Sequence, residues 1–184
     1  MIIGIYGNRD NGRTGMLIRD IISNSCQDVH YYTRLEEWRK CKEASQSHEY
    51  EIIQIFNAGL PHEAKLDILV QVSGDQSRLQ DAIHYIKPKG YAILNSDSMN
   101  KMDLYCRDIY AVSYGFNSKA TVTASSIDDV QGLSFSYYLQ RAVPVIGKGI
   151  IQPFEIPISL SGETQDIHSC LAAYTCIMIL GFEI

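Results

Sequence analysis

Apolar runs of strand length alternate with amphipathic stretches through roughly the first half of the chain. The apolar runs cover residues 1–6, 52–56, 68–72 and 91–94. Residues 16–22, 35–42 and 76–86 have the spacing of helices, and the last of these stretches ends at the stop signal Lys87-Pro88-Lys89-Gly90. Near-continuous apolar strands separated by helices are typical of a parallel sheet that is covered on both faces.

The pattern changes after residue 102, where the segments become shorter and alternate between apolar and polar residues. Four such segments cover residues 109–114, 121–127, 133–139 and 154–160, separated by turn-forming residues as in hairpins. A last helix is expected over 167–180, ended by Gly181. Its core-facing side is predicted to carry Ile167, Leu171, Tyr174, Ile177 and Met178. Residues 1–184 are therefore predicted to form one α/β domain, a parallel sheet flanked by helices with a small antiparallel β extension.

A glycine-rich loop joins the first predicted strand to the first predicted helix. Residues 7–14 read G-N-R-D-N-G-R-T and depart from the phosphate-binding pattern G-x-x-x-x-G-K-[ST] where Arg13 replaces lysine. In that pattern Gly7 and Gly12 allow backbone N–H groups to surround a phosphate at a helix N-terminus, and the hydroxyl of Thr14 holds Mg²⁺. This context predicts a P-loop-type site for a nucleotide or phosphate. The alternative is a glycine-rich turn that binds nothing.

Composition argues against several other classes of protein. The 184 residues have a formal net charge of −5 and no basic cluster, which does not fit a nucleic-acid-binding face. The five cysteines are widely spaced without a C-x-x-C pair, so zinc and a disulfide framework are not expected. No membrane-spanning run or signal peptide is recognised, and we therefore expect a cytoplasmic protein with no membrane partner.

Other polar residues at strand ends are weaker candidates. Asp75 and Asp97 follow predicted strands on the side where parallel sheets bind ligands, but a solvated loop carboxylate is the preferred interpretation of each. The five histidines, His168 among them, are spread along the chain and are interpreted as surface or capping residues.

The order of these pieces resembles the central, ATP-binding domain of the Mur ligase family, which includes folylpolyglutamate synthetase and cyanophycin synthetase. Residues 10–14 are similar to the second half of the family's P-loop G-T-x-G-K-[ST], and 54–60 to its E-x-S-S-x-G-L. Similar matches place T-N-x-x-x-D-H at 70–76, G-x-x-x-x-N-x-D-D at 90–98 and H-N-x-x-N-A-L-A-A at 165–173. The resemblance implies binding of ATP or ADP through Gly7, Asn11, Gly12, Arg13, Thr14 and Asp166.

The departures from the family pattern fall on positions that carry chemistry. The family's metal-binding Glu corresponds to Gln54, its metal-linked His to Gln76, and its Asn near the adenine to Asp166. Mg²⁺ prefers carboxylate oxygens beside the substrate phosphates, so Thr14 is the main metal candidate left, with Gln54, Asp75 and Gln76 as weak ones. The resemblance thus implies a nucleotide site in which Mg²⁺ binding is doubtful.

Three functions remain open at this point. The first is a nucleotide- or phosphate-binding accessory domain without ligase activity of its own, since the family's N-terminal and C-terminal ligase domains are expected to be absent. The second is an ATP-dependent carboxylate–amine ligase subunit whose missing domains come from a partner protein. The third is a structural relic that binds nothing and acts as a homo-oligomer.

Overall fold

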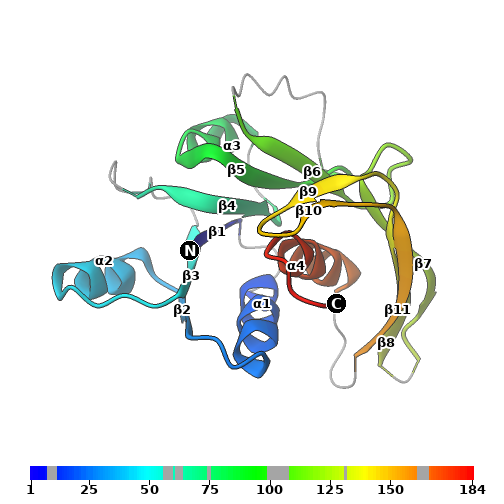
Figure 1. Ribbon diagram of the computed structural model, residues 1–184, viewed down its shortest axis with the longest axis horizontal. Coiled ribbons are helices and arrows are strands. Elements are labelled where there is room, and N and C mark those ends of the chain that lie inside the picture. Colours follow the sequence, from blue (N-terminus) through cyan, green and yellow to red (C-terminus); the bar gives the residue numbers. More distant parts are fainter. Residues whose placement is uncertain are drawn as a thin grey trace.

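A nine-stranded sheet forms the centre of the computed structural model (Figure 1). The structure describes residues 1–7, 12–55, 60, 64–73, 76–98, 108–130, 132–160 and 166–184, with the side chains of 76–78 left out. The sheet order is β11-β8-β7-β6-β5-β4-β1-β3-β2. All adjacent pairs from β2 to β7 are parallel, and β7, β8 and β11 pair antiparallel.

The strands have the following bounds: β1 Ile2–Tyr6, β2 Val29–Tyr32, β3 Tyr50–Ile55, β4 Leu66–Gln71, β5 Ile86–Asn95, β6 Tyr110–Tyr114, β7 Val122–Asp128, β8 Leu133–Leu139 and β11 Phe154–Leu160. A separate antiparallel hairpin consists of β9 Val143–Val145 and β10 Gly149–Ile151. The helices are α1 Arg13–Asn24, α2 Leu35–Glu43, α3 Gln76–Ile83 and α4 Ile167–Ile179.

Alternating strand residues divide the core into two layers. Ile3, Ile5 and Val70 point to the face that α1 and α4 cover, while Leu66 and Leu69 point to the face covered by α2 and α3. This two-sided burial explains why β1, β3 and β4 read as continuous apolar runs.

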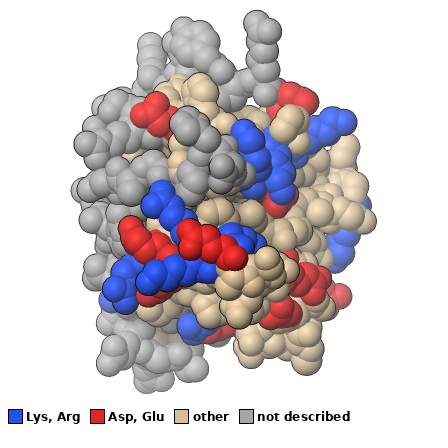
Figure 2. All heavy atoms as spheres, turned by 90° about the vertical axis from the view of Figure 1, so that its left-hand side faces the viewer, with Lys and Arg blue, Asp and Glu red and all other residues tan. Residues whose placement is uncertain are grey.

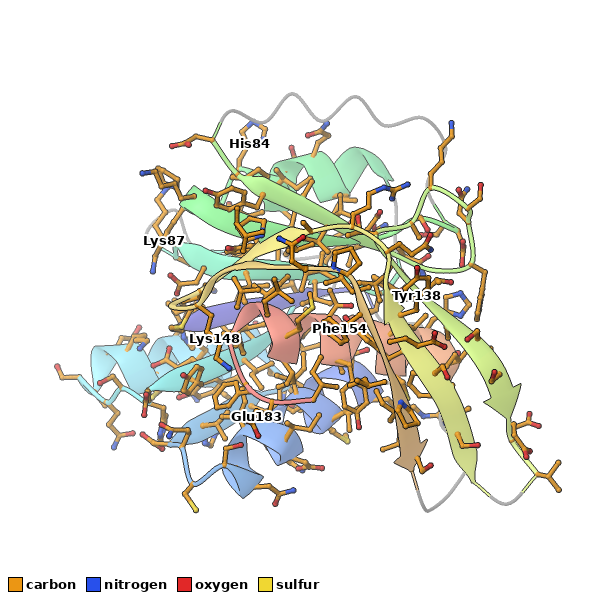
Figure 3. The ribbon with its side chains drawn as sticks, turned by 45° about the vertical axis from the view of Figure 1, so that its right-hand side comes forward. His84, Lys87, Tyr138, Lys148, Phe154 and Glu183 are labelled. Atoms are coloured by element: carbon orange, nitrogen blue, oxygen red, sulfur yellow. The ribbon has the colours of Figure 1, made fainter. Side chains whose placement is uncertain are left out.

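The β9–β10 hairpin lies beside helix α4 and the sheet (Figure 1). The hairpin is tied to the helix end because the Ile146 amide donates a 2.9 Å hydrogen bond to the Ile179 carbonyl. On the antiparallel part of the sheet, Phe154 at the start of β11 packs against the same core (Figure 3). The residues predicted to face the core do so, with Leu171, Ile177 and Met178 buried and Ile167 and Tyr174 packed against the core. Burial extends further than expected, because every residue of α4 from Ser169 to Ile179 except Tyr174 is buried.

The predicted fold class is confirmed, with local differences. The segment 109–114 was expected in the antiparallel part, but β6 pairs parallel with β5. The helix predicted over 76–86 ends at Ile83, and Lys87-Pro88-Lys89-Gly90 belongs to β5. The sequence did not predict β2, β9 or β10. Among the described helices, none has the length and apolarity needed to cross a membrane.

Candidate functional site

The sheet has a topological switch point between β1 and β4. From β1 the chain first builds β2 and β3 on one side, and then β4, β5 and β6 on the other. Ligands of open parallel sheets bind at such a point, outside the carboxyl ends of the strands. Gly7 directly follows β1 at this edge, and Val72 and Ser73 directly follow β4. The two strand ends lie side by side, because the Val72 amide donates a 2.9 Å hydrogen bond to the Tyr6 carbonyl.

Gly7 occupies a position that only glycine fits. Its φ is 112°, and a Cβ built there would fall 2.7 Å from the backbone nitrogen of Ser73. Its own N–H donates to the Ile55 carbonyl over 3.1 Å. The start of the predicted phosphate loop is therefore held closely between β3 and the end of β4.

The other end of the loop is the N-terminus of α1. Gly12 caps this helix with a φ of 81° and provides no side-chain cap, and the first turn holds no acidic residue. Arg13 is the first helical residue and is exposed, whereas Thr14 is fully buried. The helix start thus carries a positive side chain and the positive end of the helix dipole, an arrangement that favours an anion. Asn11 lies outside the described residues.

Gln54 connects β3 to the start of the loop and to Tyr31 of β2. Its Nε2 donates to the Gly7 carbonyl and, over 3.4 Å, to the Ile5 carbonyl. Its Oε1 accepts a 2.9 Å hydrogen bond from Tyr31 Oη of β2. The side chain is 2% exposed, and both the nitrogen and the oxygen of its amide form hydrogen bonds with protein atoms. These contacts suit an amide and do not suit a metal ligand, so the weak metal candidacy of Gln54 finds no support in its geometry.

A pocket of about 340 Å³ opens at the same edge of the sheet. It is lined by Val72, Asn95, Asp97, Ser98, Tyr114, Asp166, His168 and Ser169, which come from the ends of β4, β5 and β6 and from the start of α4. Tyr114 is fixed in this wall because its Oη donates to the Gln71 carbonyl over 2.8 Å. The pocket therefore combines an apolar wall with several polar groups, as small-molecule sites do.

His168 lies between two carboxylates on the pocket wall. Its Nε2 is 3.0 Å from Asp97 Oδ2, and its Nδ1 is 3.9 Å from Asp166 Oδ1. Asp97 also accepts hydrogen bonds from the backbone amides of Phe116 at 2.7 Å and Asn117 at 2.8 Å. The pair Asp97–His168 thus joins the end of β5, the β6–β7 turn and the start of α4.

The protonation states of this cluster follow from its contacts. The neighbouring Asp166 carboxylate raises the pKa of His168, with Asp97 adding to the effect against the opposing effect of burial. Burial raises the pKa of Asp97, but hydrogen bonds from Phe116, His168 and Asn117 outweigh it and lower the net pKa. His168 and the Ser169 hydrogen bonds lower the pKa of Asp166. The cluster therefore favours an imidazolium between two carboxylates, with a net charge of −1.

Asp166 has a structural role that its place in the motif did not reveal. It is the N-cap of α4, and its Oδ2 accepts hydrogen bonds from the Ser169 amide at 2.9 Å and the Ser169 hydroxyl at 2.8 Å. It also lines the pocket, so its predicted contact with a nucleotide stays a prediction. Asp75 and the side chain of Gln76 lie outside the described part. Within the described residues, no three His, Cys, Asp or Glu side chains are grouped to hold a metal ion.

Charges on one outer face of the molecule are mixed. The face that carries α2 shows Lys and Arg interspersed with Asp and Glu (Figure 2), and α2 itself places Glu36 and Glu37 in its first turn and Lys40 and Lys42 in its last. The described residues of this face do not form the concentrated positive patch that a nucleic acid would require.

No known protein family and no curated protein sequence matches this chain. Solved structures do match it. MurF from Acinetobacter baumannii has a TM-score of 0.69 at 13% identity, covering 100% of this chain and 43% of its own. The MurF ligase from Thermotoga maritima, solved in complex with ADP, has a TM-score of 0.68 at 12% identity, with coverages of 100% and 46%. The chain has a Mur ligase-like fold.

Folylpolyglutamate synthetase from Lactobacillus casei shares the Mur ligase-like fold more distantly. Its TM-score is 0.55 at 11% identity, and the match covers 97% of this chain and 56% of the synthetase. The resemblance read from the sequence motifs is thereby confirmed at the level of the fold. The chain spans less than half the length of the MurF ligases that it matches.

Proposed function

We propose that this chain is a nucleotide- or phosphate-binding domain with a Mur ligase-like core, acting as an accessory module without ligase activity of its own. The proposal depends on one observation: both ends of the loop, Gly7 and Gly12–Thr14, lie at the switch point of the sheet. The ADP complex of a structurally similar MurF ligase supports the choice of nucleotide.

The loop and the pocket suit different parts of one nucleotide. Arg13 and the N-terminal end of the α1 dipole favour phosphate, whereas two carboxylates in the pocket wall repel it. Asp166 and Asn95 present groups that pair with the N–H and O–H donors of a base or ribose. We therefore assign the phosphates of ATP or ADP to the loop and the nucleoside to the pocket.

Weak catalysis is expected from the same residues. Phosphoryl transfer depends on positioned positive charge, and a lysine ammonium in a P-loop is replaced here by Arg13. The Gln54 amide is engaged with Gly7 and Tyr31 and brings no charge to a metal. Mg²⁺ therefore does not fit at Gln54, and the nucleotide is proposed to bind with little dependence on it, Thr14 being the remaining metal candidate.

The competing function is an ATP-dependent amide-forming ligase subunit completed by a partner protein. It is favoured by the fold, since more than half of each matched MurF ligase has no counterpart in these 184 residues. A partner that carries an acceptor domain would then restore ATP turnover. A homo-oligomeric relic that binds no nucleotide is the third candidate. In every case we expect a cytoplasmic protein without a nucleic-acid or membrane partner.

Thermal unfolding with ligands tests the proposal. ATP or ADP at one hundred times its Kd should stabilise the protein by about 2.7 kcal/mol. Gly12→Ala should abolish this shift, because the added Cβ would lie 2.9 Å from Tyr31 Oη at the loop.

Gly147→Ala is the matched control. Gly147 has a similar φ of 73° but has no atom within 4 Å of the added Cβ, so it carries the same backbone strain away from the loop. It should lower the melting temperature and keep the ligand shift. If ATP, ADP and pyrophosphate at millimolar concentration give no shift, the nucleotide proposal is wrong.

A further inference from the structure

Tyr31 and Gln54 form a connected unit across the phosphate loop, which we call the loop clamp. The chain of contacts runs from Tyr31 Oη to Gln54 Oε1 and from Gln54 Nε2 to the Gly7 carbonyl. Gly7 is the start of the loop, and Tyr31 reaches its end. The two side chains come from neighbouring strands, with Tyr31 paired with Ile52 two residues before Gln54.

Tyr31 packs directly on the first turn of α1. A Cβ on Gly15 would fall 2.6 Å from Tyr31 Cζ, and one on Gly12 would fall 2.9 Å from Tyr31 Oη. The backbone of this turn is therefore in contact with the phenol ring, and the absence of side chains at both glycines is what permits the approach. The ring of Tyr31 thus contacts the end of the loop, and its hydroxyl is bonded to Gln54, which in turn is bonded to Gly7 at the start of the loop.

The orientation of the Gln54 amide is fixed by its partners. The carbonyls of Gly7 and Ile5 accept hydrogen bonds only, so the nitrogen must face them and the oxygen must face Tyr31. A glutamate at position 54 would place a carboxylate oxygen against the carbonyl oxygens of Gly7 and Ile5, and the two would repel each other. A residue at this position can therefore either bond to Gly7 through an amide or offer a carboxylate to a cation, but not both.

We propose that Tyr31 and Gln54 are positioning residues for the phosphate loop, and that their hydrogen-bonded clamp holds the loop start at Gly7 and the loop end at Gly12 in place without a divalent cation. The inference rests on the proposed nucleotide site. Loop ends that are held in place before binding lose less conformational freedom when phosphate arrives, so the clamp raises affinity without contacting the ligand.

Hydrogen exchange tests the clamp without any ligand. In Tyr31→Phe the ring stays and the bond to Gln54 is lost, so the Gly7 and Met16 amide protons, bonded to Ile55 and Gly12, should exchange about two- to tenfold faster. Tyr32→Phe is the matched control, because it removes a hydroxyl on the other face of β2 that donates to Cys41 Sγ. It should leave these two protons unchanged. Equal exchange in the two variants would overturn the clamp.

Affinity for ATP and for pyrophosphate gives the second readout. Tyr31→Phe should weaken both about two- to tenfold, equally in Mg²⁺ and in EDTA, while Tyr32→Phe should bind like the unmodified protein. An affinity that is unchanged in Tyr31→Phe, or a loss that Mg²⁺ restores, would overturn the inference. If the unmodified protein binds neither ligand, the proposed function fails, and the exchange experiment still decides whether the clamp holds the two ends of the loop.

Discussion

Replacing Gln54 by glutamate changes one nitrogen to oxygen at the centre of the loop clamp. The variant keeps the hydrogen bond from Tyr31 Oη, but it loses the two donations of Nε2 to the Gly7 and Ile5 carbonyls. The side chain is 2% exposed, so water cannot replace these bonds. Leaving a buried acceptor without its donor costs about 1–3 kcal/mol, and burying the carboxylate adds to this. We expect Gln54→Glu to destabilise the protein by about 3 kcal/mol at pH 7.

The pH dependence of this cost has a definite sign. Burial and the facing carbonyls raise the pKa of the introduced carboxyl above its unfolded value of about 4.3. The penalty is therefore small below that pH and grows as the pH rises through the folded pKa. Urea unfolding at pH 4.5 and pH 7 should show a larger gap between variant and unmodified protein at pH 7.

A second buried glutamine provides the control. Gln71 on β4 is fully buried, its Oε1 accepts from the Asn95 amide at 3.3 Å, and no described residue accepts from its Nε2. Gln71→Glu thus buries a carboxylate without removing a hydrogen bond donated to a described residue. It should lower the free energy of unfolding by about 1–3 kcal/mol less than Gln54→Glu does. If Gln54→Glu is as stable as the unmodified protein at pH 7, or is stabilised by millimolar Mg²⁺, the position is a metal site and the clamp reasoning is wrong.

Three further predictions follow from the same structure. Glu51 is 2% exposed and accepts hydrogen bonds from Trp38 Nε1 at 2.8 Å and from Lys42 Nζ. Glu51→Ala should therefore lower the free energy of unfolding, measured in urea, by about 3 kcal/mol, and a loss below about 1 kcal/mol would contradict this. The raised pKa of His168 gives stability that is present below its unfolded value of 6.5 and is lost as the pH rises through the folded pKa, while the lowered pKa values of Asp97 and Asp166 give stability that is lost below 3.8. The cluster should therefore contribute most between about pH 4 and 6.5, and His168→Gln should flatten the decline above pH 6.5 in urea titrations; an unchanged profile would show that the cluster is not coupled to folding. The isolated chain should release phosphate from ATP only in traces, and turnover of about one per second that is lost in Thr14→Ala would make it an enzyme.

The periodicity of the sequence was sufficient to predict the strands that are buried on both faces. Runs such as Ile52–Ile53 and Ile68–Leu69–Val70 are apolar because helices cover both sides of the sheet. The edge strand β2 has only four residues, among them the exposed His30, and it gave no such run. Alternation predicted β6 as a strand but contains no information on direction, which depends on its neighbour β5. The burial of α4 on nearly all sides depends on its packing against α1, the sheet and the β9–β10 hairpin together, which local pattern did not reveal.

The candidate site was predictable only where it is local in sequence. Gly7 and Gly12 could be recognised because a strand, a loop and a helix follow one another directly. The contact of Tyr31 with Gln54 depends on two strands being neighbours, and that of Asp97 with His168 on the return of α4 to the end of β5. Residue type alone gave Gln54 as a weakened metal ligand, whereas its hydrogen bonds explain the glutamine directly.

Calorimetric titration of ADP into the purified chain in EDTA tests the central claim most directly. The account predicts saturable binding of one ADP per chain, an affinity that changes less than about threefold when Mg²⁺ replaces EDTA, and loss of binding in Gly12→Ala but not in Gly147→Ala. An absence of heat at millimolar ADP in both conditions, or binding that appears only with Mg²⁺, would contradict it.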